Sequence, residues 1–223
     1  MINIEKVETW GFEHAVRGMR NPLNSWSKSD SGYRADGEHY DYVKYVIGDE
    51  DMKLMRKLYK AGSEHRKYLR QVFVSMDITS NHFWWAQFDT YHIGITRDSC
   101  SKMHRIHIKE FAKEDFSTEG IDECGGMTLQ VFMEVLDELE WLRKEFNKTH
   151  EKKYWRAILE LLPMGYNIKA TVTMDYENVV SIIRQRASHK LEEWHKFVDV
   201  LMGLPYVAEI TQIERPMEAR AHE

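Results

Sequence analysis

Two segments of alternating apolar and polar residues, each followed by a residue that can cap a helix, constrain the fold of this chain most. The first covers residues 72–78 and precedes Ser80 and Asn81, and the second covers residues 168–174 and precedes Asp175. Alternation with a period of two is typical of a strand with one buried face, and Ser, Asn and Asp favour the position before a helix. The sequence therefore predicts two strand-then-helix units.

A long helical stretch separates these two units. Apolar residues recur at helical spacing between Leu129 and Phe146, and a further helical pattern ends at Pro163. Proline ends a helix because it lacks the amide hydrogen and its ring clashes with the preceding turn. Other helical patterns lie at residues 12–19, 49–59, 84–91, 175–186 and 191–201. This order predicts an α+β fold with a mixed sheet and long helices.

The chain shows no internal repeat, no low-complexity tract and no boundary that would divide it. A length of 223 residues suits one domain, which we expect to cover residues 1–223. Residues 24–38 are rich in Ser, Asp, Gly and Lys, and we expect them to form a mobile loop. The charged tail at residues 214–223 is expected to be frayed.

The charge balance and the cysteines exclude several classes of protein. The chain has 31 Lys and Arg against 36 Asp and Glu, whereas a general nucleic-acid binder needs a basic surface. No apolar run approaches the roughly 18 residues of a membrane helix, and the N-terminus lacks the basic start of a signal peptide. Two cysteines, Cys100 and Cys124, do not make a disulfide framework. We expect a cytoplasmic protein without nucleic-acid or membrane partners.

Eleven histidines raise the question of a metal site. His104 and His107 have a spacing that can bring two imidazoles together on a helix, but no third ligand follows at a suitable spacing. We therefore predict no metal site and interpret the two histidines as a surface pair.

Two polar clusters are open to a functional and a structural interpretation. Cys100 follows Arg97 and Asp98, and neighbouring cations lower the pKa of a thiol, so it is either a reactive thiolate or a half-buried cysteine without chemistry. Arg184 and Arg186 lie close to further basic residues, and the cluster either binds a phosphate or a pyrimidine carbonyl or forms a solvated basic face.

Residues 162–186 resemble the C-terminal signature of the flavin-dependent thymidylate synthases. In that family a Leu-Pro pair ends a helix, a Thr-rich strand leads to an Asn, and the next helix carries an Arg that contacts the uracil of dUMP. Counted without a gap from Leu162-Pro163, that Arg falls on Arg186, the Asn on Asp175, and a second Asn near the flavin on Ser181.

The upstream half resembles the family motif Arg-His-Arg-x-x-Ser-x-Asn-Glu-x-Ser-x-Arg, which falls without a gap on residues 90–102. The opening Arg-His-Arg corresponds to Thr90, Tyr91 and His92, and the two serines correspond to Ile95 and Cys100. The Asn-Glu pair corresponds to Arg97 and Asp98, and the final Arg corresponds to Lys102. A flavin-contacting His of the preceding strand falls on Gln71. A phosphate-binding Arg falls on Leu159, with Arg156 nearby as a substitute.

The resemblance implies a homotetrameric enzyme with FAD as cofactor. It would transfer a one-carbon unit from methylenetetrahydrofolate to C5 of dUMP, with NADPH as reductant. Arg186 would polarise the uracil. The implied contacts to the nucleotide are Arg156, Lys102, Arg97, Asp98 and Arg186, and those to the flavin are His92, Gln71, Asp175, Ser181 and Tyr91. We add the hypothesis that a Cys100 thiolate attacks C6 of the pyrimidine.

The two missing arginines of the opening Arg-His-Arg leave alternatives open. Because a charge-assisted hydrogen bond contributes about 1.5–3 kcal/mol, their loss weakens anion binding by about 10² to 10⁴. A second hypothesis is therefore a non-redox protein that binds or sequesters a nucleotide on the same fold. A third is that the resemblance is structural only and that Trp84, Trp85 and Tyr91 close the pocket.

Overall fold

The structure is a computed structural model that describes residues 2–35 and 43–213. Its strands are β1 (Asn3–Trp10), β2 (Gly32–Ala35), β3 (Val43–Val46), β4 (Phe73–Asn81), β5 (Ile95–Ser99) and β6 (Asn167–Asp175). Its α-helices are α1 (Phe12–Arg20), α2 (Asp49–Lys60), α3 (His82–Phe88), α4 (Lys102–Arg105), α5 (Glu119–Cys124), α6 (Gly126–Thr149), α7 (Lys152–Leu161), α8 (Tyr176–Arg186), α9 (Glu192–Met202) and α10 (Val207–Thr211). Short 3-10 helices are η1 (Asn21–Leu23), η2 (Trp26–Lys28), η3 (Lys67–Gln71) and η4 (Lys113–Asp115).

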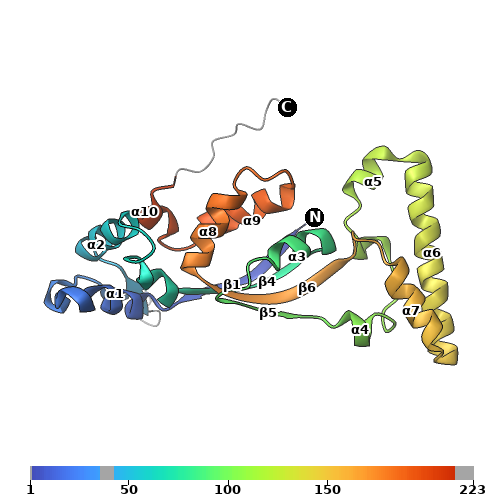
Figure 1. The fold of residues 1–223 in the computed structure, drawn as a ribbon, viewed down its shortest axis with the longest axis horizontal. Coiled ribbons are helices and arrows are strands. Elements are labelled where there is room, and N and C mark those ends of the chain that lie inside the picture. The colour runs from blue at the N-terminus through green and yellow to red at the C-terminus, as the bar shows by residue number, and fades with distance from the viewer. Residues whose placement is uncertain (1, 36–42, 214–223) are drawn as a thin grey trace. The chain divides into compact units, whose positions relative to one another are not determined.

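Four strands, β1, β4, β5 and β6, form one sheet (Figure 1), and their order is β1-β4-β6-β5. Strand β2 pairs with β3 as an antiparallel hairpin. Thr171 donates to Asp77 at 2.7 Å and Thr173 contacts Ser75 at 3.1 Å, so β6 and β4 run in opposite directions. The predicted α+β class with long helices is confirmed. The sheets are antiparallel where a mixed sheet was expected.

The described chain falls into two compact units that interleave along the sequence. The first comprises residues 2–5, 77–92 and 97–172, and the second comprises residues 6–35, 43–76, 93–96 and 173–213. Four boundaries lie within β1, β4, β5 and β6, and one lies in the segment between α3 and β5. One domain over residues 1–223 stays a prediction.

In the first unit, α6 and α7 pack side by side as a helical hairpin (Figure 1). Leu139 of α6 and Ile158 of α7 are fully buried in the same apolar cluster. Asn81 caps α3 as predicted, because its side-chain oxygen accepts the Trp84 amide at 3.0 Å. The apolar face that the sequence predicted for the long helix therefore packs against α7 in the core of this unit.

In the second unit, the predicted helices after Asp175 are confirmed as α8 and α9. The Asp175 carboxylate accepts the backbone N–H of Asn178 at 2.8 Å and so caps α8. Val179, Ile183 and Trp194 are buried and supply the apolar faces of the two helices. No helix in the described ranges is both long enough and apolar enough to span a membrane.

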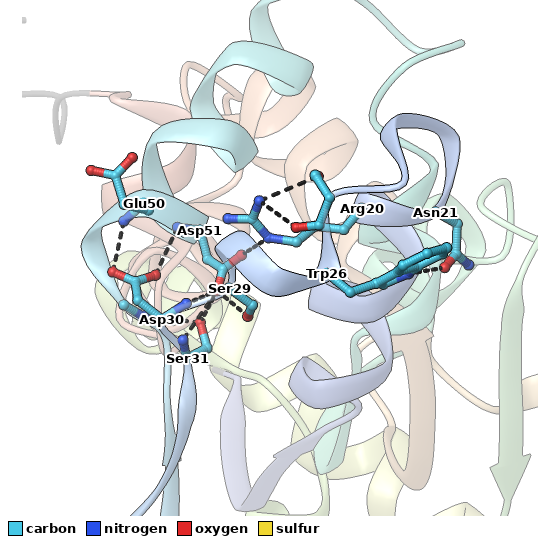
Figure 2. Close-up of polar contacts among 10 residues, drawn as sticks. Arg20, Asn21, Trp26, Ser29, Asp30, Ser31, Glu50 and Asp51 are labelled. Atoms are coloured by element: carbon cyan, nitrogen blue, oxygen red, sulfur yellow. Dashed lines mark hydrogen bonds and ion pairs between the residues drawn. The ribbon is translucent and has the colours of Figure 1, made fainter.

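Residues 24–35 contain η2 and β2 and are held against α2, where the sequence indicated a loop over 24–38 (Figure 2). The buried carboxylate of Asp51 accepts hydrogen bonds from the side chains of Ser29 and Ser31, each at 2.6 Å, and from Arg20 Nε at 2.5 Å. Asp30 in turn accepts the backbone amides of Glu50 and Asp51. The polar residues of this segment indicated a loop, because their hydrogen-bond partners on α2 lie about 20 residues away and do not show in a local pattern. Residues 36–42 and the tail at 214–223 lie outside the described residues.

Candidate functional site

The second unit contains a cavity of about 720 Å³ whose walls are largely aromatic. The aromatic lining comprises Trp10, Phe12, Tyr33, Tyr45, Phe73 and Tyr206. Trp10 stacks on Phe73 with ring centroids 5.9 Å apart, and Phe12 meets Tyr206 edge to face at 5.3 Å. Flat, rigid walls of this kind accept a planar ring.

Two exposed cations line the same cavity. Lys44 and Arg70 line it, are exposed, and have no side-chain hydrogen bond or ion pair within the described part of the chain. The acidic residue in the lining, Glu13, accepts the Tyr33 hydroxyl at 2.9 Å, and this hydrogen bond raises the pKa of Tyr33. Two available cations beside aromatic rings suit a ligand with an anionic group.

Gln71, a predicted flavin contact, lines the cavity and is exposed, and it lies close to the backbone at the start of α1. Gly11 has φ +95°, and a Cβ there would lie 2.0 Å from the Gln71 carbonyl oxygen. A Cβ on Gly18 of α1 would lie 2.3 Å from the Gln71 side-chain oxygen. Glycine is required at position 11, because the close atom there is backbone, whereas the flexible Gln71 side chain can move away from position 18. The start of α1 therefore approaches the Gln71 backbone closely.

Asp175, a second predicted flavin contact, lies at the end of β6, close to the chain segment that carries Gln71. The Tyr176 amide donates to the Val72 carbonyl at 2.9 Å, which places the end of β6 next to Gln71. Burial raises the pKa of Asp175, although hydrogen bonds from Asn178 and the Arg70 charge oppose that shift. The structure thus brings the chain segments of Gln71 and Asp175 together, and Arg70 both lines the cavity and acts on the Asp175 carboxyl through its charge.

Asn178 and Arg70 are residues of this region that the sequence analysis missed. Asn178 Nδ2 donates to Asp175 Oδ1 at 2.9 Å and to the Ile93 carbonyl at 3.0 Å, and so joins α8 to the segment before β5. Its position three residues after a capping Asp was the available signal. Arg70 directly precedes Gln71, but its charge carried no signal because the sequence did not show which face of η3 lines a cavity.

In the first unit, the Arg97 side chain contacts Asp89 and Trp85. Its Nη1 donates to both carboxylate oxygens of Asp89, at 2.5 and 2.6 Å, and its guanidinium lies 4.1 Å from the centre of a Trp85 ring. The predicted contact between Arg97 and a nucleotide stays a prediction.

The rest of the predicted motif lies at the surface of the first unit. Asp98 and Cys100 are exposed, and the Cys100 amide donates to the Lys169 carbonyl at 3.2 Å, which extends the pairing of β5 with β6. His92 is exposed with Nδ1 3.1 Å from the Thr90 carbonyl, and Tyr91 packs near Phe88. Lys102 begins α4, but its side chain is outside the described part.

The remaining predicted residues lie on helices. Arg156 is exposed on α7 and pairs with Glu160 at 3.0 Å, a surface ion pair of the weak kind. On α8, Ser181 accepts a hydrogen bond from Gln185 at 3.0 Å, and Arg186 lies over the Trp194 ring at 4.5 Å. Across residues 2–35 and 43–213, no three His, Cys, Asp or Glu side chains gather to hold a metal ion.

The fold is shared with flavin-dependent thymidylate synthases. A structure of thymidylate synthase ThyX from Helicobacter pylori with FAD and dUMP matches with a TM-score of 0.64 at 14% identity, covering 95% of this chain and 97% of that chain. A second structure of the same Helicobacter pylori protein, also with FAD and dUMP, has a TM-score of 0.63 at 15% identity, covering 93% and 97%. No family model and no curated protein sequence matches the chain. At this identity the likeness establishes the fold.

Replacing Asp175 with Asn is expected to raise the thermal midpoint at pH 7 and to leave it nearly unchanged near pH 3. A carboxyl whose folded pKa is raised costs stability once the pH exceeds its unfolded value of about 3.9, whereas an amide carries no charge. Asn also serves as a helix cap, so α8 keeps its first hydrogen bond. Calorimetry at both pH values tests this, and a larger gain at pH 3 than at pH 7 would contradict it.

Proposed function

We propose that the chain is a divergent enzyme of the flavin-dependent thymidylate synthase type, which transfers a one-carbon unit to C5 of a pyrimidine nucleotide, dUMP. The observation that carries the proposal is the cavity of the second unit, in a chain that shares its fold with ThyX over 95% of its length. Aromatic walls and the available cations Lys44 and Arg70 fit a planar, anionic ligand.

The residues present fit FAD. A volume of about 720 Å³ is within the range of small-molecule sites, and the stacked pair Trp10 and Phe73 offers an aromatic surface. Lys44 and Arg70 supply cations in a chain that lacks the opening Arg-His-Arg of the family motif. With these residues we propose flavin contacts from Gln71, Asp175, Ser181, Tyr91 and His92. When bound, FAD would supply the redox chemistry that links NADPH and methylenetetrahydrofolate to the nucleotide.

The nucleotide would be held by groups of this chain that carry charge. We assign Arg186 to the uracil carbonyl, where a guanidinium stabilises negative charge that develops on oxygen. Arg156, Lys102, Arg97 and Asp98 are the proposed contacts to the phosphate and sugar. Arg156 is available, because its ion pair with Glu160 is exposed on both sides.

Cys100 is proposed as a nucleophile, since its thiol is exposed. Its thiolate would form a bond to C6 of the pyrimidine, and the electron pair of the C5–C6 double bond would move toward C5 and the neighbouring carbonyl oxygen. After C5 gains the carbon unit and loses its proton, the S–C6 bond breaks and the thiolate leaves. Arg186 would stabilise the charge on the carbonyl oxygen during both steps.

A homotetramer and a cytoplasmic location complete the proposal. Met127, Val131 and Trp141 on α6 are exposed apolar side chains, at 71%, 49% and 49%, and an oligomer would cover them.

The proposal is tested by the visible absorbance of the purified protein, by mass spectrometry of the small molecules released on heating, and by a dUMP methylation assay. We expect flavin bands, released FAD, and methylation that requires methylenetetrahydrofolate and NADPH. A colourless protein that releases a nucleotide would support the non-redox binding alternative. A colourless protein that also fails to bind added FAD would contradict the proposed function.

A further inference from the structure

One wall of the cavity is a tight turn whose backbone suits glycine but carries a tyrosine. The Val207 amide donates to the Leu204 carbonyl at 3.2 Å across Pro205 and Tyr206. Tyr206 has φ 63° and ψ 2°, the conformation of the third residue in a type II turn, and proline is common at the second. Glycine or asparagine normally occupies the third position, because a larger side chain at positive φ crowds the backbone.

Helix α10 does not explain why a tyrosine occupies this position. Tyr206 directly precedes α10 (Val207–Thr211), where Ser, Thr, Asp or Asn in an extended conformation is favoured. Its side chain makes no capping hydrogen bond. A bulky residue in the left-handed region is an outlier that persists only where its surroundings hold it, and such outliers cluster at ligand sites.

Three contacts hold the turn and its ring. The Tyr176 hydroxyl donates to the Pro205 carbonyl at 3.0 Å, and the Ile47 amide donates to the Tyr206 hydroxyl at 3.3 Å. The Tyr206 ring also meets the buried Phe12 ring edge to face at 5.3 Å. The ring is therefore fixed at both ends while it lines the cavity.

We propose that Tyr206 is a positioning residue whose ring, fixed in advance, is the surface against which the planar ring of the cavity ligand packs. A glycine would relieve the turn but would remove this part of the wall. Ordering the ring before binding reduces the entropy that the ligand must overcome. The inference rests on the proposed function only for the identity of the ligand, which would be a flavin or a pyrimidine nucleotide.

The test compares the full-length chain with Tyr206→Gly and Tyr206→Phe. Thermal midpoints are measured by calorimetry, and dissociation constants for FAD, FMN, dUMP and AMP are measured separately by fluorescence titration. We expect Tyr206→Gly to stay folded, because glycine suits the turn and offsets part of the lost contacts with Phe12 and Ile47. It should bind its ligand about ten-fold more weakly, because stacking on the ring is lost. Tyr206→Phe keeps the ring and should bind nearly as the wild type does.

His150→Gly is the matched control. His150 also lies at positive φ, 57°, but it follows α6 in the first unit and does not line the cavity. Its replacement should relieve the backbone in the same way while the dissociation constants stay unchanged.

The outcomes separate this inference from the proposed function. Equal FAD binding by wild type and Tyr206→Gly would overturn the inference and leave the proposed function standing. A wild type that ignores FAD and dUMP but binds FMN or AMP, with binding lost in Tyr206→Gly, would support the inference and overturn the proposed function. A wild type that binds none of the four probes would overturn both.

Discussion

Replacing Asp51 with Asn is expected to lower the free energy of unfolding by about 3–5 kcal/mol, the usual effect of removing one partner of a buried ion pair. Asp51 has no solvent-exposed surface, and Arg20, its partner at 2.5 Å, is 4% exposed. The substitution leaves the Arg20 guanidinium buried without its counter-charge. It also replaces a carboxylate oxygen, which accepts hydrogen bonds from the Ser29 and Ser31 hydroxyls, with an amide nitrogen that cannot accept them (Figure 2).

The effect of Asp51→Asn should shrink as the pH falls. Burial alone would raise the pKa of Asp51, but hydrogen bonds from Ser29, Ser31 and Arg20, with the Arg20 charge, hold the pKa below its ordinary value. A depressed carboxyl pKa contributes stability that is present above the unfolded value of about 3.9 and is lost as the pH falls through the folded value. The difference between wild type and variant is therefore largest near neutral pH.

Urea unfolding at pH 7 and at pH 3 measures both parts of this prediction. Asp49→Asn is the matched control, because Asp49 is an exposed residue in the same first turn of α2. Removing the Asp49 charge should lower the free energy of unfolding by no more than about 1 kcal/mol, because only its interaction with the helix dipole is lost. Equal destabilisation by the two variants would show that burial and the Arg20 pair do not matter at Asp51.

Replacing Arg70 with Gln is expected to weaken binding of an anionic ligand by about 10- to 100-fold, since a hydrogen bond to a charged group contributes about 1.5–3 kcal/mol. Arg70 is exposed in the cavity wall and makes no side-chain hydrogen bond or ion pair among the described residues, so its guanidinium can donate to a ligand. The same substitution should raise the pKa of Asp175 further, because the Arg70 charge lowers it in the wild type.

Titration of FAD and of dUMP at low and high salt measures the effect of Arg70→Gln. The loss should be greater at low salt, where the charge is less screened. Lys60→Gln is the control, because it removes an exposed cation from the last turn of α2 outside the cavity lining. If Lys60→Gln weakens binding as much as Arg70→Gln does, the effect comes from net charge and not from a contact in the cavity.

Several elements of the fold followed from local sequence patterns. The alternation before Asn81 and Asp175 predicted β4 and β6, and both residues cap the next helix through their own side chains. The apolar spacing between Leu129 and Phe146 predicted α6. These signals are local, because a strand period, a capping side chain and a helix face each depend on residues only a few positions apart.

Other elements depended on partners far away in the chain. Residues 95–99 show no alternating pattern yet form β5, and the pairing of β5 with β6 continues in the hydrogen bond from the Cys100 amide to the Lys169 carbonyl. Polar residues in a strand at the edge of a sheet carry little periodic signal. Residues 24–35 read as part of a loop because the sequence did not show that Asp51 would bind Ser29 and Ser31.

The candidate site, like the fold, was predicted in part from the sequence and in part follows only from tertiary contacts. The family resemblance led to Gln71 and Asp175, and tertiary contacts place them next to each other through the Tyr176 and Val72 backbones. It did not lead to Arg70 or Tyr206, because a cavity wall is assembled from segments that have no common spacing in the sequence.

The sequence by itself determined the α+β class, the two capped strand-then-helix units and the long helix, since each arises from interactions between near neighbours. Only the tertiary structure decided the strand order, the engagement of Arg97 by Asp89, and the aromatic, cationic cavity. Those features arise from burial and pairing between residues that become neighbours only when the chain has folded.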